Sequence, residues 1–345
     1  MSVLDRADLR ARVQTALERF VAQRRPDLLA MGPELAPMAD AVQDFLSGGK
    51  RLRPAFCFWG HLGAGGADSD ALVLAASSLE MFQAAALLHD DVMDGSDTRR
   101  GKPSVHRAFE ALHTASGWHG SAEVFGRGAA ILLGDLCLAW SDEMLVASGL
   151  VTPSARTVFD AMRAELSAGQ YLDLLEQVRP DTTVETALRV ARYKSAKYTI
   201  VEPLLLGAGL ADVDLTAVYT AYGMPLGVAF QLRDDLLGVF GDPAVTGKPA
   251  GDDLREGKRT VLVAMALERA SAAQASLVRR ELGSPTAAVD DLRQVLVDTG
   301  AVEQVEAMIS TGCEQALAAL AGSSVTADAV AALTDLALAA TARQS

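Results

Sequence analysis

Two pairs of neighbouring aspartates carry the strongest chemical signal in this sequence. Asp90 and Asp91 stand in the string HDDVMDGSDTRRG, and Asp234 and Asp235 stand in the string QLRDDLLGVFGD. Each pair closes a long apolar segment, where burial of an unpaired carboxylate would cost free energy. Oxygen ligands without a neighbouring Cys suit a hard cation such as Mg²⁺, which bridges a few carboxylates to the phosphates of a substrate. The two pairs therefore predict one diphosphate held between two helix ends.

The first pair has a spacing that suits a helix. Asp90 and Asp94 are four residues apart and share a helical face, whereas Asp91 lies about 100° round the helix. Arg99 and Arg100 follow, and guanidinium forks match phosphate oxygens. Carboxylates beside arginines fit a metal-bound diphosphate. They also fit an exposed acidic helix end whose charges pair with the arginines, and the string alone leaves both interpretations open.

The string GGKRLRP, from Gly48 to Pro54, favours the first interpretation. It places three cations within four residues, after two glycines and before an apolar segment. A flexible turn into a helix N-terminus offers backbone N–H groups and a favourable dipole to an anion. The alternative is a solvated basic turn.

The bulk composition excludes several classes of protein. The chain has 345 residues, of which 50% are hydrophobic, so it can bury a large core. A net charge of -13 argues against a nucleic-acid binder. We expect no transmembrane segment and no signal peptide, since no apolar run reaches about 18 residues and the first residues are polar. Cys57, Cys137 and Cys313 are far apart in apolar segments, so we expect reduced core thiols and a cytoplasmic location.

Almost every segment has the apolar spacing of a helix, and Ala and Leu are abundant. The expected helices are Leu4–Val21, Ala71–Met93, Ala129–Val146, Ala155–Val178, Val184–Leu206, Leu215–Phe240, Val261–Leu282, Val302–Leu320 and Ala327–Ala340. No strand pattern competes with them. The expected loops are Ala115–Gly128 and Gly241–Gly257. The sequence predicts one all-α domain over residues 1–345.

From about Gly48 to Thr260 the chain resembles the trans-isoprenyl diphosphate synthases, or polyprenyl synthetases. GGKRLRP, the first aspartate string with its RRG, and QLRDDLLGVFGDPAVTGK occur in the family's order. The resemblance implies a bundle of antiparallel helices around a deep central cavity, built as a homodimer. It also implies an Mg²⁺-dependent enzyme, with several ions in each active site, that joins isopentenyl diphosphate head to tail to an allylic diphosphate.

The resemblance also implies a role for each matching residue. The metal ligands are Asp90, Asp91, Asp94, Asp234 and Asp235, with Asp235 acting through water. Arg99, Lys248 and Lys258 match residues that hold the allylic diphosphate, and Lys50, Arg53 and Arg100 match the pocket for isopentenyl diphosphate. Gln83 matches a donor to phosphate. Lys194, Ser195, Gln231, Gln170 and Asp173 match catalytic residues around the reacting carbons.

One departure concerns the second metal string. It ends in Gly238, where many members of the family have a third aspartate. Asp242 lies eight residues past Asp234, roughly two turns of a straight helix, and cannot simply stand in for that ligand. The two helix ends that carry the aspartate pairs would form the first and second walls of the site. The sequence therefore predicts that the second wall binds metal mainly through Asp234.

The helix before Asp90 is expected to set the product length. Ala85 and Ala86 are small at positions where farnesyl-producing relatives often have an aromatic ring, and Phe82 is large enough to form a floor. The growing product is expected to run along this helix from the metal site, in a tunnel that a large side chain would close. If that side chain lies three residues further from Asp90, the tunnel is longer by about 4.5 Å, close to the length of one isoprene unit. This favours a C20 geranylgeranyl product. Farnesyl diphosphate and C25 or longer products are the alternatives.

Two other classes of protein share part of this pattern. A terpene cyclase has the helical bundle and the first aspartate motif, but it does not need GGKRLRP or a second Asp-Asp pair. A non-catalytic subunit of a heteromeric synthase typically lacks an aspartate motif, whereas the first motif here is intact. Both alternatives are therefore less favoured than a catalytic synthase.

Overall fold

The computed structural model describes residues 7–179, 182–242, 251–284 and 286–342, and almost all of them are helical. The first half contains α1 (Leu9–Met31), the 3₁₀ turn η2 (Pro33–Leu35), α2 (Ala36–Phe45), α3 (Leu52–Gly63), α4 (Asp70–Met93), β1 (Thr98–Arg99), β2 (Lys102–Pro103), α5 (Val105–Ala115), α6 (Ala122–Ala147) and α7 (Pro153–Val178). The second half contains α8 (Val184–Val190), the π-helix η3 (Ala191–Val201), α9 (Glu202–Leu210), α10 (Thr216–Phe240), α12 (Asp252–Arg255), α13 (Val261–Arg269), α14 (Ala272–Glu281), α15 (Val289–Asp298), α16 (Ala301–Leu320) and α17 (Ala327–Thr341).

The helices begin where side chains can satisfy the free N–H groups of the first turn. Ser69, Thr152 and Thr183 are the N-caps of α4, α7 and α8, and each side chain accepts from the N–H three residues on. Pro153 follows Thr152 at the first helical position, where the missing N–H costs nothing. Local sequence therefore fixes the start of these three helices.

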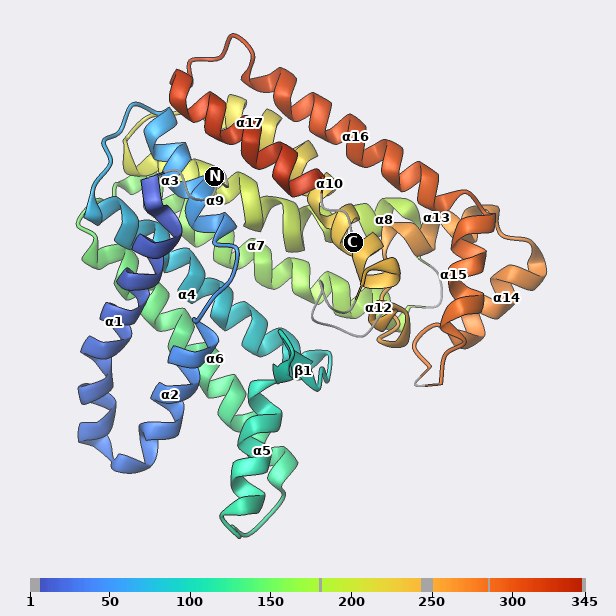
Figure 1. Ribbon diagram of the computed structural model, residues 1–345, viewed down its shortest axis with the longest axis horizontal. Helices are drawn as coiled ribbons and strands as arrows, with labels where there is room; N and C mark the ends of the chain where they lie inside the picture. The colour runs from blue at the N-terminus through green and yellow to red at the C-terminus, as the bar shows by residue number, and fades with distance from the viewer. Residues whose placement is uncertain (1–6, 180–181, 243–250, 285, 343–345) are drawn as a thin grey trace.

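Two buried clusters hold the bundle together. The larger surrounds α3 and α4, where α4 packs on α6, α3 and α1. The smaller surrounds the second half of α10, which α13, α15 and α16 cover. Figure 1 shows α4, α7 and α10 in the middle of the bundle, with α16 and α17 along one side. The two aspartate pairs thus lie on helices that the core fixes.

The all-helical prediction is confirmed, with corrections at several boundaries. The expected loop Ala115–Gly128 is wrong after residue 121, because α6 already begins at Ala122 with Ser121 as its cap. The expected helix Val261–Leu282 is two helices, because Ser271 and Gln274 form a capping box that starts α14. The second expected loop, Gly241–Gly257, contains the short helix α12.

Further elements were missed because their signals are short. The described residues include one antiparallel hairpin, in which Arg99 of β1 pairs with Lys102 of β2. The helices α2, α5 and α15 lie outside the expected ranges, whereas α3 is the helix that was expected to follow GGKRLRP. Arg99 therefore belongs to a short hairpin between α4 and α5.

Helix α4 corrects the expectation about apolar runs. It is the one helix, within the residues the structure describes, that has the length and mean hydropathy of a membrane span. In the bundle, 72% of that apolar window is buried, and α6 and α3 pack against it. Its apolar surface is therefore covered by protein. The three cysteines are also buried and unpaired, as expected.

Candidate active site

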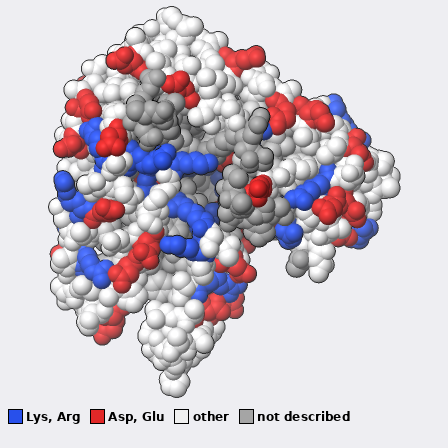
Figure 2. Space-filling view, viewed as in Figure 1, with Lys and Arg blue, Asp and Glu red and all other residues white. Residues whose placement is uncertain are grey.

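Residues from both halves of the chain line a cavity of about 580 Å³, within the size range of small-molecule sites. Described residues that line it include Lys50, Asp90, Arg99, Asp173, Lys194, Ser195, Gln231, Asp234, Asp235, Gly238, Asp253 and Lys258. Lys and Arg side chains gather around a hollow in the middle of one face of the molecule (Figure 2). Both aspartate pairs contribute to one cavity, as the sequence predicted.

On the first wall, Asp90 is held by a lysine and a glutamine. Lys194 Nζ lies 3.2 Å from Asp90 Oδ1, and Gln170 Nε2 donates to the same oxygen at 3.0 Å. Arg99 lies 3.5 Å from the other carboxylate oxygen. Burial raises the pKa of Asp90, but the charges of Lys194 and Arg99 outweigh burial and lower it. Asp90 is therefore an anion at neutral pH.

Asp91 and Asp94 have different surroundings, as their helical positions indicate. Asp91 is buried and accepts a hydrogen bond from Arg99 Nε at 2.8 Å. Asp94 ends α4, and its buried Oδ1 has no hydrogen-bond partner among the described residues. Burial, with a smaller contribution from Asp90, raises the pKa of Asp94 to about 6. A cation near Asp94 would satisfy this oxygen and lower that pKa.

On the second wall, Asp235 is buried and belongs to a hydrogen-bond chain. Gln231 Nε2 donates to Asp235 Oδ1 at 2.7 Å, and the Ser195 hydroxyl donates to Gln231 Oε1. Burial, together with the charges of Asp253 and Asp234, raises the pKa of Asp235 to about 8. Gln231 lies one turn before Asp235 on α10, so its place in the site follows from sequence spacing.

Lys194 and Ser195 reach the cavity from the π-helix η3. The wide turns of a π-helix are frequent at functional sites. Lys194 Nζ also lies 2.6 Å from Asp173 Oδ2 on α7. A Cβ atom on Gly169 would lie only 2.7 Å from the Lys194 backbone nitrogen, so glycine allows α7 to approach η3. Gln170 and Asp173 therefore lie beside Lys194, as the resemblance implied.

The cationic residues of GGKRLRP, the basic string, have different neighbours. Lys50 lines the cavity, whereas Arg53 donates to Thr199 Oγ1 at 2.9 Å and lies 4.3 Å from the Tyr198 ring centroid. The Tyr198 hydroxyl in turn donates to Gln83 Oε1 at 2.6 Å. Arg53 and Gln83 are thus two ends of one polar cluster.

The remaining basic residues also have protein partners. Arg100 donates to the Phe45 carbonyl at 3.1 Å. Lys258 Nζ lies 3.1 Å from Asp253 Oδ1 and 2.7 Å from Glu256 Oε2. Lys248, predicted to bind the allylic diphosphate, lies outside the described residues. Arg100 is not among the described residues that line the cavity.

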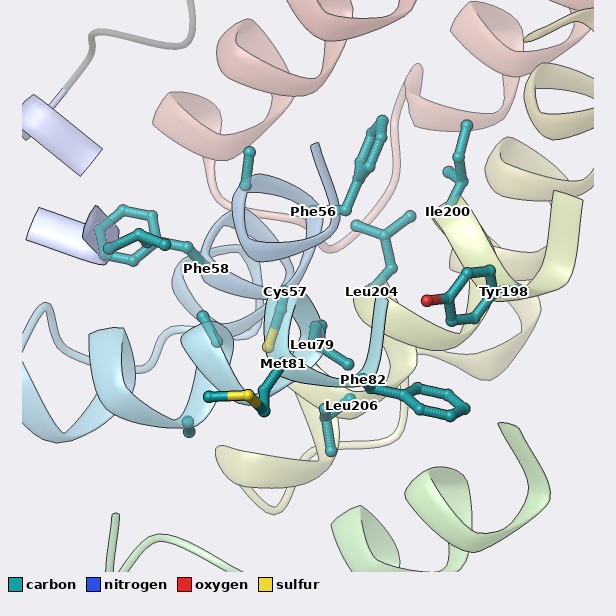
Figure 3. Packing of buried hydrophobic residues seen from close by; sticks show 14 of the residues in the cluster. Phe56, Cys57, Phe58, Leu79, Met81, Phe82, Tyr198, Ile200, Leu204 and Leu206 are labelled. Atoms are coloured by element: carbon teal, nitrogen blue, oxygen red, sulfur yellow. The ribbon is translucent and has the colours of Figure 1, made fainter. Parts of the chain in front are cut away.

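The three residues predicted to set product length lie along α4. Phe82 packs against Tyr198 and Phe159, with ring centroids 5.3 and 6.1 Å away, and Figure 3 shows it beside Tyr198. Ala85 is buried and Ala86 half-buried. None of the three is among the described residues that line the 580 Å³ cavity. Their role in product length stays a prediction.

Sequence reasoning missed Arg51, Tyr198 and Asp253. Arg51 stands inside GGKRLRP, yet its side chain turns into the core to pair with Glu80. Tyr198 lies four positions after Lys194 in the string YKSAKYT, where nothing in the sequence distinguishes it from a core aromatic residue. Asp253 stands in the string GDDLREGK, where a third Asp pair close to Lys258 was the available signal.

The carboxylates fit Mg²⁺, although no group of three His, Cys, Asp or Glu side chains in the described ranges forms a ready-made metal cluster. Mg²⁺ commonly takes one or two carboxylates, several waters and substrate phosphates, and such a site needs no protein cage. A bound cation would satisfy the buried Asp94 oxygen, and it would lower the raised pKa of Asp235.

A helical bundle with two carboxylate walls, lysines and arginines around one cavity is the architecture of an isoprenoid synthase. A profile of the polyprenyl synthetase family matches residues 36–299. The geranylgeranyl diphosphate synthase of Mycobacterium tuberculosis is 36% identical over 285 residues, which are 80% of this chain and 75% of that protein. The geranylfarnesyl diphosphate synthase of Aeropyrum pernix is 34% identical over 75% of this chain and 79% of its own length.

The structural comparison agrees with the sequence comparison. The crystal structure of geranylgeranyl pyrophosphate synthase from Corynebacterium glutamicum, complexed with isoprenyl diphosphate and magnesium, superimposes with a TM-score of 0.92. That chain is 42% identical, and the match covers 96% of this chain and 98% of that one. This chain belongs to the polyprenyl synthetase family. It is a prenyltransferase that makes a prenyl diphosphate, and the expectation from the sequence motifs is confirmed.

Proposed function

We propose that the enzyme condenses isopentenyl diphosphate with an allylic diphosphate, depends on Mg²⁺, and makes mainly the C20 geranylgeranyl product. The observation that supports it best is that Asp90 from α4 and Asp235 from α10 line one cavity that also contains Lys194 and Lys258. Carboxylates and ammonium groups in one cavity can bind metal ions and phosphate oxygens together.

The charged residues would act on the leaving group. When the allylic C–O bond breaks, negative charge develops on the departing diphosphate, and Mg²⁺ held by the aspartates would stabilise that charge. Arg99, Lys194 and Lys258 line the cavity, where they can approach the diphosphate oxygens. Their present carboxylate partners hold them in place before the substrate arrives, which is preorganisation of the kind that electrostatic catalysis requires.

The allylic carbocation would lie near neutral oxygen atoms. The Ser195 hydroxyl and the Gln231 amide line the cavity and are hydrogen-bonded to each other. Their dipoles can stabilise a cation without forming a covalent bond to it. The alkene of isopentenyl diphosphate attacks the cation, and the released diphosphate accepts the proton that is lost. No side-chain base is required by this scheme.

The proposed C20 product rests on Phe82. The chain is similar to synthases named for C15, C20 and C25 products, so the family itself permits all three lengths. Phe82 is a large buried residue about two turns before Asp90 on α4, with small residues at 85 and 86 between them. This spacing supports a floor one isoprene unit beyond the C15 position.

We also propose a homodimer formed through α6. This helix exposes the apolar side chains of Val124, Ile131, Leu132 and Val146, and Leu132 is 60% exposed. Their separations are close to multiples of seven, so they lie along one side of the helix. A second copy related by twofold symmetry would cover the same stripe on both chains. Light scattering should show a dimer for the native chain and a monomer for Leu132→Glu.

One experiment tests the reaction and the product together. Purified enzyme is incubated with isopentenyl diphosphate and each allylic primer, with Mg²⁺ or with a chelator, and the products are sized by chromatography. We expect a C20 product only when Mg²⁺ is present, and no product from Asp90→Ala. Product formation with chelator would contradict the metal assignment, and a different chain length would contradict only the C20 proposal.

A further inference from the structure

Gly238 and Asp253 occupy complementary positions beside the second wall. Gly238 lies on α10, one helical turn after Asp234, and lines the cavity. A Cβ atom built on Gly238 would lie 2.5 Å from the carboxyl carbon of Asp253, and closer still to one of its oxygens. The Asp253 carboxylate therefore fills the space in which a side chain at position 238 would begin.

Asp253 is held there by its own helix rather than by Gly238. Its helix α12 follows Gly251, whose φ of 76° is readily adopted only by glycine. Leu254 is buried in the smaller core cluster, and its carbonyl accepts a hydrogen bond from the Gly283 N–H at 2.9 Å. The Asp253 carbonyl accepts from the Lys258 N–H, also at 2.9 Å. The backbone around Asp253 is thus fixed on both sides.

The Asp253 side chain lines the cavity and has Lys258 beside it. Its side chain is 14% exposed, and Lys258 Nζ lies 3.1 Å from Oδ1. In the proposed function, Lys258 binds the allylic diphosphate. If its ammonium turns to phosphate, a mostly buried carboxylate would lose its counter-ion, which is costly unless another cation replaces it. Mg²⁺ that arrives with the diphosphate is such a cation.

We propose that Asp253 supplies, from α12, the third carboxylate of the second metal-binding wall, in the place that Gly238 leaves open on α10. The second wall then consists of Asp234 and Asp235 from one helix and Asp253 from another. This inference rests on the Mg²⁺ dependence proposed above. It replaces the sequence expectation that the third carboxylate is simply missing.

The test measures Mg²⁺ binding rather than turnover. Mg²⁺ is titrated by calorimetry into enzyme that has been preincubated with inorganic pyrophosphate. Asp253→Asn keeps the size of the side chain and removes its charge, and we expect Mg²⁺ affinity to fall about ten- to a hundredfold. Gly238→Ala leaves every charge in place but pushes the Asp253 carboxylate away, so we expect a loss in the same direction. Asp290→Asn, whose side chain is 95% exposed, is the matched control and should bind as the native enzyme does.

A double variant tests whether the two positions are interchangeable. Gly238→Asp combined with Asp253→Ala returns the carboxylate to α10, and we expect most of the lost affinity to be recovered. Native Mg²⁺ affinity in Asp253→Asn would overturn the proposal. A loss in Asp253→Asn without recovery in the double variant would overturn the replacement and leave Asp253 as a partner of Lys258 alone. A native enzyme that binds no Mg²⁺ with pyrophosphate would count against the proposed metal dependence instead. Circular dichroism without metal should show that Asp253→Asn is folded as the native chain is, so that a lower Mg²⁺ affinity does not reflect a loss of fold.

Discussion

Arg51 and Glu80 form an ion pair in the interior of the bundle, with 2.6 Å between Nη1 and Oε2 and side-chain exposures of 3% and 7%. Arg51 also donates to Gln14 Oε1 at 2.5 Å and to the carbonyl of Leu46. Its backbone adopts a left-handed φ of 53° at the start of α3. The guanidinium thereby joins α1, the end of α2 and α4 beneath the basic string. We infer that Arg51 positions its neighbours instead of binding substrate.

Removal of the Glu80 charge should destabilise the protein strongly. Glu80→Gln leaves a buried guanidinium without its counter-ion, which costs about 3 kcal/mol or more of unfolding free energy. Urea unfolding followed by circular dichroism measures the change. Glu185→Gln is the control, because Glu185 is 83% exposed in its pair with Arg189, and we expect a change below about 0.5 kcal/mol. Equal effects of the two substitutions would show that the buried pair contributes no more than a surface pair.

Substitutions in the two proposed diphosphate pockets should separate the two substrates. Lys50→Ala and Arg53→Ala should raise the KM for isopentenyl diphosphate far more than the KM for the allylic primer, and Arg99→Ala should do the reverse. Each substitution removes a charge-assisted contact worth about 1.5–3 kcal/mol, or roughly ten- to a hundredfold in binding. Steady-state kinetics with one substrate varied at a time give both constants. Equal increases in the two KM values would show that Lys50 and Arg53 have only a structural role.

The length of the product should respond to single substitutions on α4. Ala86 lies only about 40° from the Asp90 direction and is half-buried, whereas Ala85 lies about 140° away and is buried. Ala86→Phe should therefore shorten the product towards C15, with Ala85→Phe the weaker change, and Phe82→Ala should lengthen it past C20. Chromatography of the products from identical substrate mixtures distinguishes these outcomes. If all three variants make the native product, this side of α4 does not determine the length of the product.

The buried Asp235 carboxyl should make the metal-free protein less stable as pH rises. Burial raises its pKa to about 8, so the folded protein keeps a proton that the unfolded chain releases near pH 4. Because the folded state binds more protons in this window, stability falls as the pH rises from about 4 to about 8. Asp235→Asn removes this effect, and its Tm advantage over the native chain should grow through that range and then level off. A constant difference in Tm across the range would contradict the raised pKa.

The sequence predicted the parts of the site that depend on local spacing. Asp90 and Asp94, or Gln231 and Asp234, share a helical face wherever the helix lies, so the aspartate strings identified both walls. Lys194 could be placed beside Asp90 only through the resemblance, because η3 and α4 are far apart in the chain.

The missed features depend on contacts between distant segments. Asp253 fills the space beside Gly238 only because α12 folds back against α10. In the same way, nothing in GGKRLRP distinguishes the buried Arg51 from the cavity-lining Lys50, since the difference depends on Glu80 in α4. Such contacts form only in the packed bundle, so the local spacing of residues does not predict them.

The position of α17 has a consequence for the order in which the chain folds during synthesis. Thr326, at the start of α17, bonds to Leu62 and Gly63 at the end of α3, and the buried Tyr222 hydroxyl of α10 donates to Leu333 at 2.7 Å. A ribosome must therefore complete about 260 residues after α3 before α3 acquires this cover. Until then, α3 and α10 expose apolar surface and Tyr222 lacks its acceptor. We expect nascent chains that end before Ala327 to be cleaved readily by protease in α10, and to become resistant once α17 has left the exit tunnel. The helix that carries the second metal wall would then be the last part of the active site to become protected.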